Sequence, residues 1–376
     1  MPELPEVETV RRGLEKLVVG RVITKVKILN EKSFQASNAD VKNFVVGAKI
    51  VAARRRAKVL ILDLDDDFSL VIHLKMTGQI VFRDDDENWG AGHPTNSFVA
   101  DLPDKSTRVE FELGEPFRET VFSEPDLPPK NVIRDFPPAE PSQGDEPVGE
   151  NRNIHFSSAN LENGSEKSFA KLPHSSAKTA DNSAPKSAAK LFFNDQRKFG
   201  WIKLVPTRDV ANLDFIKKLG PEMADFSEKN GGDFDAKSAQ KLFIKNVRKH
   251  AGAPIKAVIL NQQVVAGIGN IYADEALWGA KIYPAEPVKN LSDNQLKKIF
   301  REAVAAMEKS LAAGGSTMKN YVRADGSRGD YLEKFANVFR REGQPCPRCG
   351  TEIIKIRVAG RGTHICPKCQ KLKEAA

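Results

Sequence analysis

The chain has 376 residues and a formal net charge of +8. This length allows two ordinary domains and a linker, and the absence of any apolar run of about eighteen residues excludes a transmembrane helix. The excess of Lys and Arg favours an anionic partner such as nucleic acid. The first residues are too acidic for a secretory signal, so we expect a cytosolic protein.

The chain opens with MPELPEVETVRRGLEKL. Residues 6–17 carry apolar side chains at every third or fourth position, which predicts an amphipathic helix with Pro5 in its first turn. Removal of an initiator methionine ahead of a small residue would leave Pro2 with a free secondary amine, directly before the acidic Glu3. Such an amine is either an accident of processing or a nucleophile.

Short apolar runs follow, among them KVLILDL, SLVIHL and TRVEFEL, separated by acidic or glycine-containing turns. This spacing predicts an antiparallel sandwich or barrel. The pattern stops at residues 116–189, which hold eight Lys and Arg against eleven Asp and Glu, a net charge of −3. Few large apolar residues recur there, so we expect a disordered insertion. The strand pattern returns at KLFFND and GWIKLV, and both are expected to pair with TRVEFEL.

After residue 207 the periodicity becomes helical, and a short ribbon surrounds the cysteines at the end of the chain. The predicted fold class is therefore α+β and multidomain, with an N-terminal β-sandwich that carries one N-terminal helix, a helical domain and a C-terminal ribbon. The expected boundaries are 1–115 for the first part of the sandwich, 116–189 for the insertion, 190–206 for the last sandwich strands, 207–336 for the helical domain and 337–376 for the ribbon.

The four cysteines form two C-x2-C pairs separated by sixteen residues: Cys346, Cys349, Cys366 and Cys369. This spacing predicts a tetrahedral four-thiolate site for one structural zinc ion, with no open position for catalysis. Between the pairs lies a basic hairpin, KIRVAGRGTH. Arg361 at its tip suits a phosphate or a minor groove, and a merely solvated arginine is the alternative.

The segment VVAGIGNIYADEAL combines two glycines, which allow a tight turn, with Asn270 at the start of a helix. We expect Asn270 to cap that helix, whose exposed amides can bind a phosphate. Lys256, in the first turn of the preceding helix, could reach the same phosphates. A purely structural turn and a solvated lysine are the alternatives.

Two further segments combine basic and apolar residues. In NDQRKFG, Arg197 and Phe199 alternate with a lysine and therefore lie on the same side of an extended segment, where they could enter a duplex. A buried phenylalanine at the end of a strand, beside a surface arginine, is the alternative. Met76, in HLKMTG, follows a predicted strand and is either a wedge or a core residue. Lys58 heads an apolar strand in RRRAKVLIL and could hold a phosphate near a reacting carbon.

These motifs, PELPEVE, RRRAK, HLKM, NDQRKFG, GIGNIYA and the four-cysteine ribbon, together resemble the formamidopyrimidine-DNA glycosylases of base-excision repair, with a long insertion in the N-terminal domain. The likeness covers nearly the whole chain outside about 115–190. It implies a bifunctional DNA glycosylase and AP lyase that excises oxidised purines, such as 8-oxoguanine and formamidopyrimidines, from double-stranded DNA. It also implies a monomer with one zinc ion in a ribbon and a helix–two-turn–helix domain.

The resemblance assigns roles residue by residue. Pro2 would be the Schiff-base nucleophile, Glu3 the proton donor, and Lys58 a proton donor in β-elimination that also contacts DNA. The residues that would contact DNA, as wedges or through phosphates, are Met76, Arg197, Phe199, Lys256, Asn270 and Arg361. Residues 314–331 resemble the mobile loop over the flipped base.

Two positions depart from the family pattern. Lys75 stands where many members have glycine, and Gln196 stands where proline is frequent. Two other functions remain open: an endonuclease VIII-like glycosylase for oxidised pyrimidines, and a lesion-binding protein without lyase activity.

Overall fold

The apolar runs of the first half of the chain form two facing five-stranded sheets. The computed structural model describes residues 2–93, 96–98, 100–114, 188–224, 226, 235–314 and 331–372. One sheet has the strand order β1-β8-β9-β6-β7 and the other has the order β2-β10-β5-β4-β3. The strands are β1 (Ile23–Ile28), β2 (Phe34–Gln35), β3 (Ile50–Arg56), β4 (Val59–Leu64), β5 (Phe68–His73), β6 (Gly78–Arg83), β7 (Asn88–Gly92), β8 (Thr107–Leu113), β9 (Ala189–Asp195) and β10 (Trp201–Pro206). Neighbours pair antiparallel except β2 and β10, so the predicted sandwich is confirmed.

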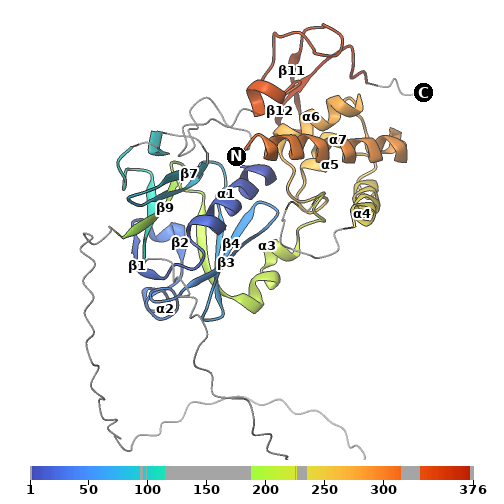
Figure 1. Cartoon of the computed structure of the whole chain (residues 1–376). Coiled ribbons are helices and arrows are strands. Elements are labelled where there is room, and N and C mark those ends of the chain that lie inside the picture. Colours follow the sequence, from blue (N-terminus) through green and yellow to red (C-terminus); the bar gives the residue numbers. More distant parts are fainter. Residues whose placement is uncertain are drawn as a thin grey trace, which may run out of the picture. The chain divides into compact units, whose positions relative to one another are not determined.

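Helix α1 (Leu4–Leu17) packs on this sandwich (Figure 1). It begins two residues earlier than predicted because Glu3 and Glu6 form a capping box, in which each side chain bonds the other residue's backbone N–H. Val7 and Val10 are fully buried in the core between the sheets. Gly13 lies so close to the Trp89 ring that a Cβ would collide with it, which lets the helix approach β7. A short second helix, α2 (Asn38–Phe44), lies between β2 and β3.

The strands on either side of the predicted insertion are neighbours in the sheet. β8 pairs with β9, and Leu113 lies opposite Ala189, as the sequence predicts for TRVEFEL and KLFFND. The insertion itself lies outside the described residues, except for residues 188 and 189 at its end.

The pairing predicted for GWIKLV is wrong. This segment is β10, which pairs with β5 and β2 in the other sheet. The reason is the five-residue turn between β9 and β10, in which the buried Asp195 carboxylate accepts a hydrogen bond from the Gly200 N–H at 2.6 Å. The chain thereby leaves one sheet and enters the second, a connection that the periodicity of either strand does not reveal.

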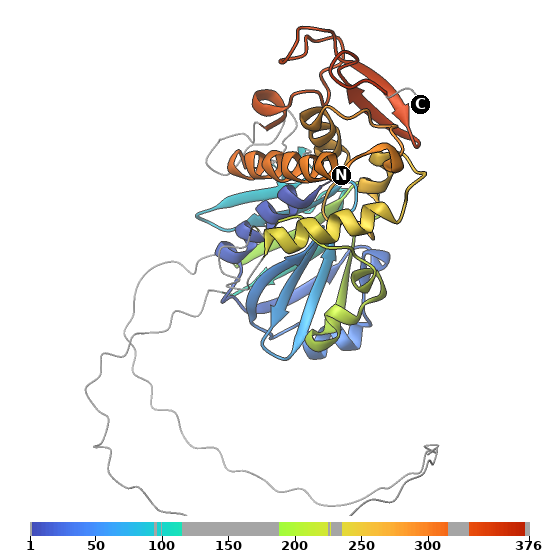
Figure 2. The ribbon, with the colours of Figure 1, turned by 90° about the vertical axis from the view of Figure 1, so that its right-hand side faces the viewer.

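The second half of the described chain is helical and has its own core. The helices with residues in this core are α4 (Ala236–Arg248), α5 (Ile255–Leu260), α6 (Asn270–Ala280) and α7 (Asp293–Ala312), with a 3-10 turn at Val288–Asn290 and a π-helical turn at Tyr331–Phe335. The short helix α3 (Asp214–Lys217) and the 3-10 turn at Thr207–Asn212 pack instead against β4 and β5 of the sandwich. Two further 3-10 turns, Glu31–Ser33 and Asn96–Phe98, lie between sandwich strands. Helix α6 is buried on nearly all sides, and α7 (orange in Figure 2) runs beside α1. Within the described part of the chain, no helix has the length and apolar character needed to cross a membrane.

The C-terminal ribbon consists of β11 (Ile354–Val358) and β12 (Arg361–Ile365), joined by a two-residue turn. Ala359 and Gly360 both have positive φ, 47° and 76°, as a tight hairpin of this hand requires. The strand β12 packs on α6, and Trp278 of that helix contacts the small core that contains Cys346 and Cys366.

Candidate active site and nucleic-acid interface

One cavity of about 610 Å³ lies where the amino terminus, the β3–β4 turn, the loop before α6 and the tip of the ribbon meet. These four segments are far apart in the sequence. Six of the residues singled out by the sequence analysis line this cavity: Pro2, Glu3, Lys58, Met76, Asn270 and Arg361.

Glu3 is only 3% exposed and sits at the N-terminal end of two helices. It is the N-cap residue of α1, and its Oε1 accepts a hydrogen bond from the Ile271 N–H of α6 at 3.0 Å. Its Oε2 is buried and has no hydrogen-bond partner among the described residues. Burial raises the pKa of Glu3 to about 7, although Lys58 acts in the opposite direction. A carboxyl group with this pKa can act as a proton donor near neutral pH.

Two glycines of the GIG motif make room for the amino terminus. Gly267 has a φ of 98°, and a Cβ there would collide with the Leu4 side chain. At Gly269 a Cβ would collide with the Glu3 carboxylate. The Leu4 N–H donates to the Gly267 carbonyl at 3.1 Å. The glycines therefore serve close packing of the amino terminus as well as the turn that the sequence predicts.

Lys58 is 5% exposed, and its ammonium donates to the Ile268 carbonyl at 2.7 Å. Burial lowers its pKa, while the charge of Glu3 opposes that shift. The preceding residue, Ala57, has a φ of 51°, and its N–H donates to Glu222 at 2.6 Å. The same carboxylate pairs with Arg55 at 2.6 Å, so Glu222, which lies between α3 and α4 in the chain, holds the turn that carries Lys58.

Asn270 and Arg361 meet at the tip of the ribbon. Asn270 is the first residue of α6 and donates from Nδ2 to the Gly362 carbonyl at 3.0 Å. The prediction that Asn270 caps α6 is wrong, because Gly269 holds the N-cap position and the Glu3 carboxylate takes the N–H of Ile271. Arg361 is exposed and lines the cavity.

The expectation that Lys256 reaches DNA phosphates requires correction. Its side chain is fully buried, and its ammonium pairs with Asp274 at 2.6 Å and donates to Thr363 Oγ1 at 2.7 Å and to the Gly362 carbonyl at 3.1 Å. These three partners take up the three N–H donors of the ammonium, so none is left to bind a phosphate. Lys256 instead ties α5, α6 and the ribbon together, because a buried charge is retained where it is paired.

Met76, Arg197 and Phe199 form one exposed group, which we call the wedge cluster. Arg197 lies over the Phe199 ring at 4.8 Å, and its Nη1 is 3.2 Å from the Met76 sulfur. Met76 is 40% exposed and Phe199 is 52% exposed, so neither is a core residue. Beneath them the buried Asp195 accepts a hydrogen bond from Thr77 and one from the Gly200 N–H.

The backbone of the wedge cluster also accounts for one departure from the family pattern. Lys75 has a φ of 52°, in the left-handed region that favours glycine. The lysine adopts the glycine-like conformation, and its N–H donates to His73 Nδ1 at 3.0 Å. The position of Met76 therefore does not depend on a glycine before it.

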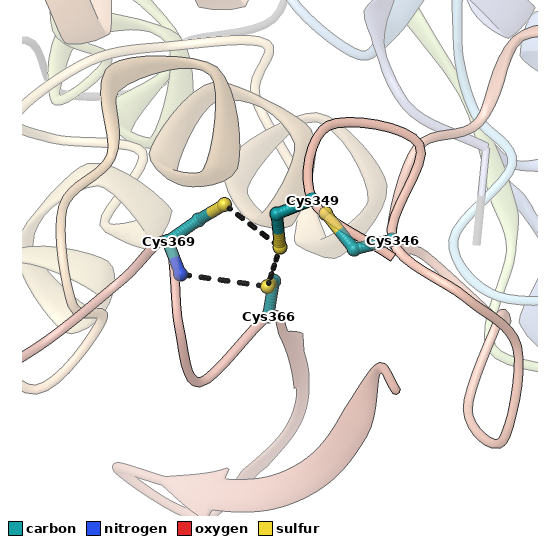
Figure 3. A group of neighbouring side chains, drawn as sticks. All are labelled: Cys346, Cys349, Cys366 and Cys369. Carbon is teal, nitrogen blue, oxygen red and sulfur yellow. Dashed lines mark hydrogen bonds between the residues drawn. The ribbon is translucent and has the colours of Figure 1, made fainter. Parts of the chain in front are cut away.

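The four cysteines converge from two turns of the ribbon (Figure 3). Their sulfur atoms lie within 4.8 Å of one another, a spacing that suits one tetrahedral zinc ion. The Trp278 Nε1–H lies 3.4 Å from the Cys346 sulfur, so a residue of α6 supports the ligand set. Since all four protein ligands are thiols, this is a structural zinc site.

Several cavity residues were not predicted from the sequence. Glu6 accepts from the Tyr272 hydroxyl at 2.6 Å, and Gln262 donates to the Ile268 carbonyl at 2.9 Å. The spacing of Glu3 and Glu6 is the pattern of a capping box and could have identified Glu6. His93 and Arg340 carry no such local signal. The candidate lid, residues 314–331, lies outside the described residues apart from its two ends.

The chain matches three family descriptions in order. Residues 1–124 match the formamidopyrimidine-DNA glycosylase N-terminal domain, residues 231–322 match the formamidopyrimidine-DNA glycosylase H2TH domain, and residues 343–372 match a zinc finger found in FPG and IleRS.

Similar proteins extend over the full length. Formamidopyrimidine-DNA glycosylase of Streptococcus thermophilus is 31% identical over 371 residues, covering 99% of this chain and 100% of the relative. That of Chloroflexus aurantiacus is 32% identical, with 98% of each chain covered. Among solved structures, Lactococcus lactis Fpg bound to DNA with an abasic site has a TM-score of 0.67 at 27% identity, covering 98% of this chain and 100% of that one. MutM bound to DNA with carbocyclic 8-oxo-G has a TM-score of 0.66 at 28% identity, with the same coverage.

Proposed function

Because this chain belongs to the formamidopyrimidine-DNA glycosylase family, we propose that Pro2, freed by removal of the initiator methionine, is its Schiff-base nucleophile. The chain is a DNA glycosylase and AP lyase of base-excision repair. The observation that carries the proposal is the position of Pro2, buried in one cavity with a protonatable carboxyl and an ammonium. An N-terminal amine has a reference pKa of about 7.7–8.0, far below the pKa of about 10.4 of a lysine, so much more of it is neutral near pH 7 than of a lysine amine.

The reaction begins with attack of the Pro2 nitrogen on C1′ of the damaged nucleoside, and the C1′–base bond breaks. The base leaves with the bonding electrons and takes up the proton that the amine loses. The C1′–O4′ bond then opens as Glu3 protonates O4′, and the nitrogen lone pair forms an iminium at C1′. This cation acts as an electron sink, which acidifies the C2′ proton. Loss of that proton and departure of the 3′ phosphate complete β-elimination. A second elimination then releases the 5′ phosphate. Base release and strand cleavage thus share one covalent intermediate.

Glu3 is the proposed proton donor of this sequence. Its raised pKa, about 7, keeps a large protonated fraction near neutrality, and its Oε2, which has no hydrogen-bond partner among the described residues, can carry the proton. Lys58 is the second proposed proton-transfer group, since its lowered pKa makes a buried ammonium a better acid than an exposed lysine. Asn270 and Arg361 would bind the phosphates that flank the lesion.

A base stacked in a duplex cannot reach Pro2, so it must be everted, at a cost of about a few kcal/mol. We propose that the side chains of the wedge cluster fill the gap that the everted base leaves in the duplex. Its members are exposed, preorganised by mutual contact and adjacent to the cavity through Met76. Cys346, Cys349, Cys366 and Cys369 would hold one zinc ion, whose role would be to fix the ribbon that carries Arg361 rather than to take part in the lyase reaction.

The proposed substrates are oxidised purines in double-stranded DNA, chiefly 8-oxoguanine and formamidopyrimidines. Two similar structures support this choice: one is a MutM complex with 8-oxo-G DNA, and the other is a Lactococcus lactis mutant complex with Fapy-dG DNA. We further propose that the protein acts as a monomer, in the cytosol of a bacterium, with the domain boundaries and the zinc ligands predicted above.

Borohydride trapping tests the proposal. The protein is incubated with a duplex containing 8-oxoguanine opposite cytosine, reduced, digested and mapped by mass spectrometry. We expect the adduct on the N-terminal peptide at Pro2, and a Lys58→Met variant should still form it. An adduct on a lysine peptide would exclude Pro2 as the nucleophile. Faster excision of thymine glycol than of 8-oxoguanine would assign the chain the pyrimidine specificity of an endonuclease VIII-like enzyme.

A further inference from the structure

Arg340 has a backbone conformation that its side chain disfavours. Its φ is 59°, in the left-handed region that glycine adopts without strain. The residue is exposed, and its guanidinium lies 5.9 Å from the centre of the Phe339 ring. A strained residue other than glycine persists where the surrounding structure holds it, and such residues cluster at functional sites.

The segment before Arg340 is held firmly by α6. The buried carboxylate of Glu275 accepts hydrogen bonds from the N–H groups of Asn337, Val338 and Phe339, each at 2.9 Å. After Arg340, the Arg341 guanidinium donates to the Ala336 carbonyl at 3.2 Å. The turn is therefore fixed on both sides, and the position of Arg340 is set before any ligand arrives.

Arg340 lies at the junction of two cavities. It lines the catalytic cavity and also a second one of about 480 Å³ over the ribbon. Four residues line both cavities: Asn270, Phe339, Arg340 and Gly362. The two cavities therefore adjoin along the line where Asn270 contacts the Gly362 carbonyl.

The charges around this junction favour an anion. Arg361 lines the first cavity together with Lys58, Glu3 and Glu6, and Arg340 lines both cavities. The acidic residue of the second cavity, Glu342, lies 2.9 Å from His364 Nε2 and 3.6 Å from the Lys355 ammonium. Its negative charge is thus offset locally, whereas the arginines add positive potential along the path between the cavities.

We propose that Arg340 binds a backbone phosphate of the damaged DNA strand where that strand passes from the catalytic cavity into the second cavity. A planar guanidinium matches two phosphate oxygens, which a glycine or a short side chain at this turn does not. This inference rests on the proposed function only in taking DNA as the ligand. It adds a phosphate site next to those of Asn270 and Arg361, at a position that the sequence analysis did not identify.

Salt-dependent binding of Arg340→Gly tests the proposal. Glycine adopts this φ freely, so we expect an unchanged or higher Tm. Loss of one phosphate contact should weaken Kd about tenfold at low salt and reduce the slope of log Kd against log salt by about 1. The loss should be equal for an undamaged duplex and for a duplex with an abasic analogue, because phosphates carry no base information. Arg340→Lys should retain most of the slope.

Arg208→Ala is the matched control, since Arg208 is exposed and lines neither cavity. We expect it to keep the wild-type slope. A wild-type slope in Arg340→Gly, or an equal loss in Arg208→Ala, would overturn the phosphate assignment. A lower Tm would show that the arginine has a structural role instead. Binding to undamaged DNA needs no Schiff base, so a failure to trap Pro2 would overturn the catalytic proposal and leave this test valid.

Discussion

The catalytic cavity and the wedge cluster face the same substrate but are built in opposite ways. In the cavity, Glu3 and Lys58 are 3% and 5% exposed. Burial raises the pKa of Glu3 and lowers the pKa of Lys58, and both shifts favour the neutral form of the group. In the wedge cluster, Met76 and Phe199 are 40% and 52% exposed and need no ionisation. Groups that transfer protons are tuned by desolvation, whereas groups that replace a base need only shape and support from below.

The largest effect should come from Glu3→Gln, which keeps the size of the side chain and removes its acid. We expect base excision to fall by about 10²–10⁴-fold, the usual contribution of a general acid, with DNA binding retained. In the wild type, the Glu3 pKa of about 7 means that the protonated form is lost as pH rises above 7. Single-turnover excision should therefore decline on the alkaline side, and the variant should lack that limb.

Gly269→Ala tests the same carboxyl without removing it. A Cβ at residue 269 would collide with the Glu3 carboxylate, so excision should fall although the acid is present. Gly252→Ala is the control, because a Cβ there meets nothing within 4 Å. Near-wild-type base release by Glu3→Gln would show that another group donates the proton. Burial of Glu3 would then not serve proton transfer, and the cavity would not differ from the wedge cluster in this respect.

Zinc removal should disrupt the ribbon side of the catalytic cavity and leave the wedge cluster intact. The ribbon core is local in sequence, and the sandwich that carries the wedge cluster shares no residue with it. We expect chelation, or Cys366→Ser, to weaken duplex binding about a hundredfold by displacing Arg361 and the Gly362 carbonyl, while the sandwich stays folded. Binding by filter retention and unfolding by circular dichroism measure the two effects. Unchanged affinity after confirmed zinc loss would show that the ribbon does not hold DNA.

The wedge cluster should depend on the residue beneath it. Asp195→Asn weakens the hydrogen bonds to Thr77 and to the Gly200 N–H, so the free energy of unfolding should fall by about 1–3 kcal/mol. Excision should fall about tenfold because the turn no longer holds the Arg197 and Phe199 side chains in position. Phe199→Ala is the counterpart, with lower excision and an unchanged urea midpoint. If Phe199→Ala excised at the wild-type rate, the ring would not fill the space of the everted base.

Replacement of residues 116–187 by a short turn should have the smallest effect. Leu113 and Ala189 face each other across β8 and β9, so a tight connection can join these strands. Since each doubling of loop length costs about 0.6 kcal/mol, shortening should leave the free energy of unfolding equal or slightly higher. Excision of 8-oxoguanine is compared for several turn lengths. A large loss at every length would mean that the insertion takes part in recognition.

Local spacing in the sequence was enough for much of this protein. The two C-x2-C pairs predicted the four-sulfur cluster, because each pair is a turn of fixed reach. Periods of two and of about 3.6 residues separated the sandwich from the helical half, since those periods follow from backbone geometry. The acidic PELPEVE start and the GIGN turn indicated where chemistry could lie.

Tertiary structure decided the rest, because burial and partners come from segments distant in the chain. Lys256 looks like a surface lysine until Asp274 and Thr363 enclose it. GWIKLV pairs in the second sheet because the Asp195 turn redirects it, which no strand period records. The pKa of Glu3 and the place of Arg340 between two cavities arise only where the amino terminus, α6 and the ribbon meet, since desolvation and electric potential depend on what lies nearby in space.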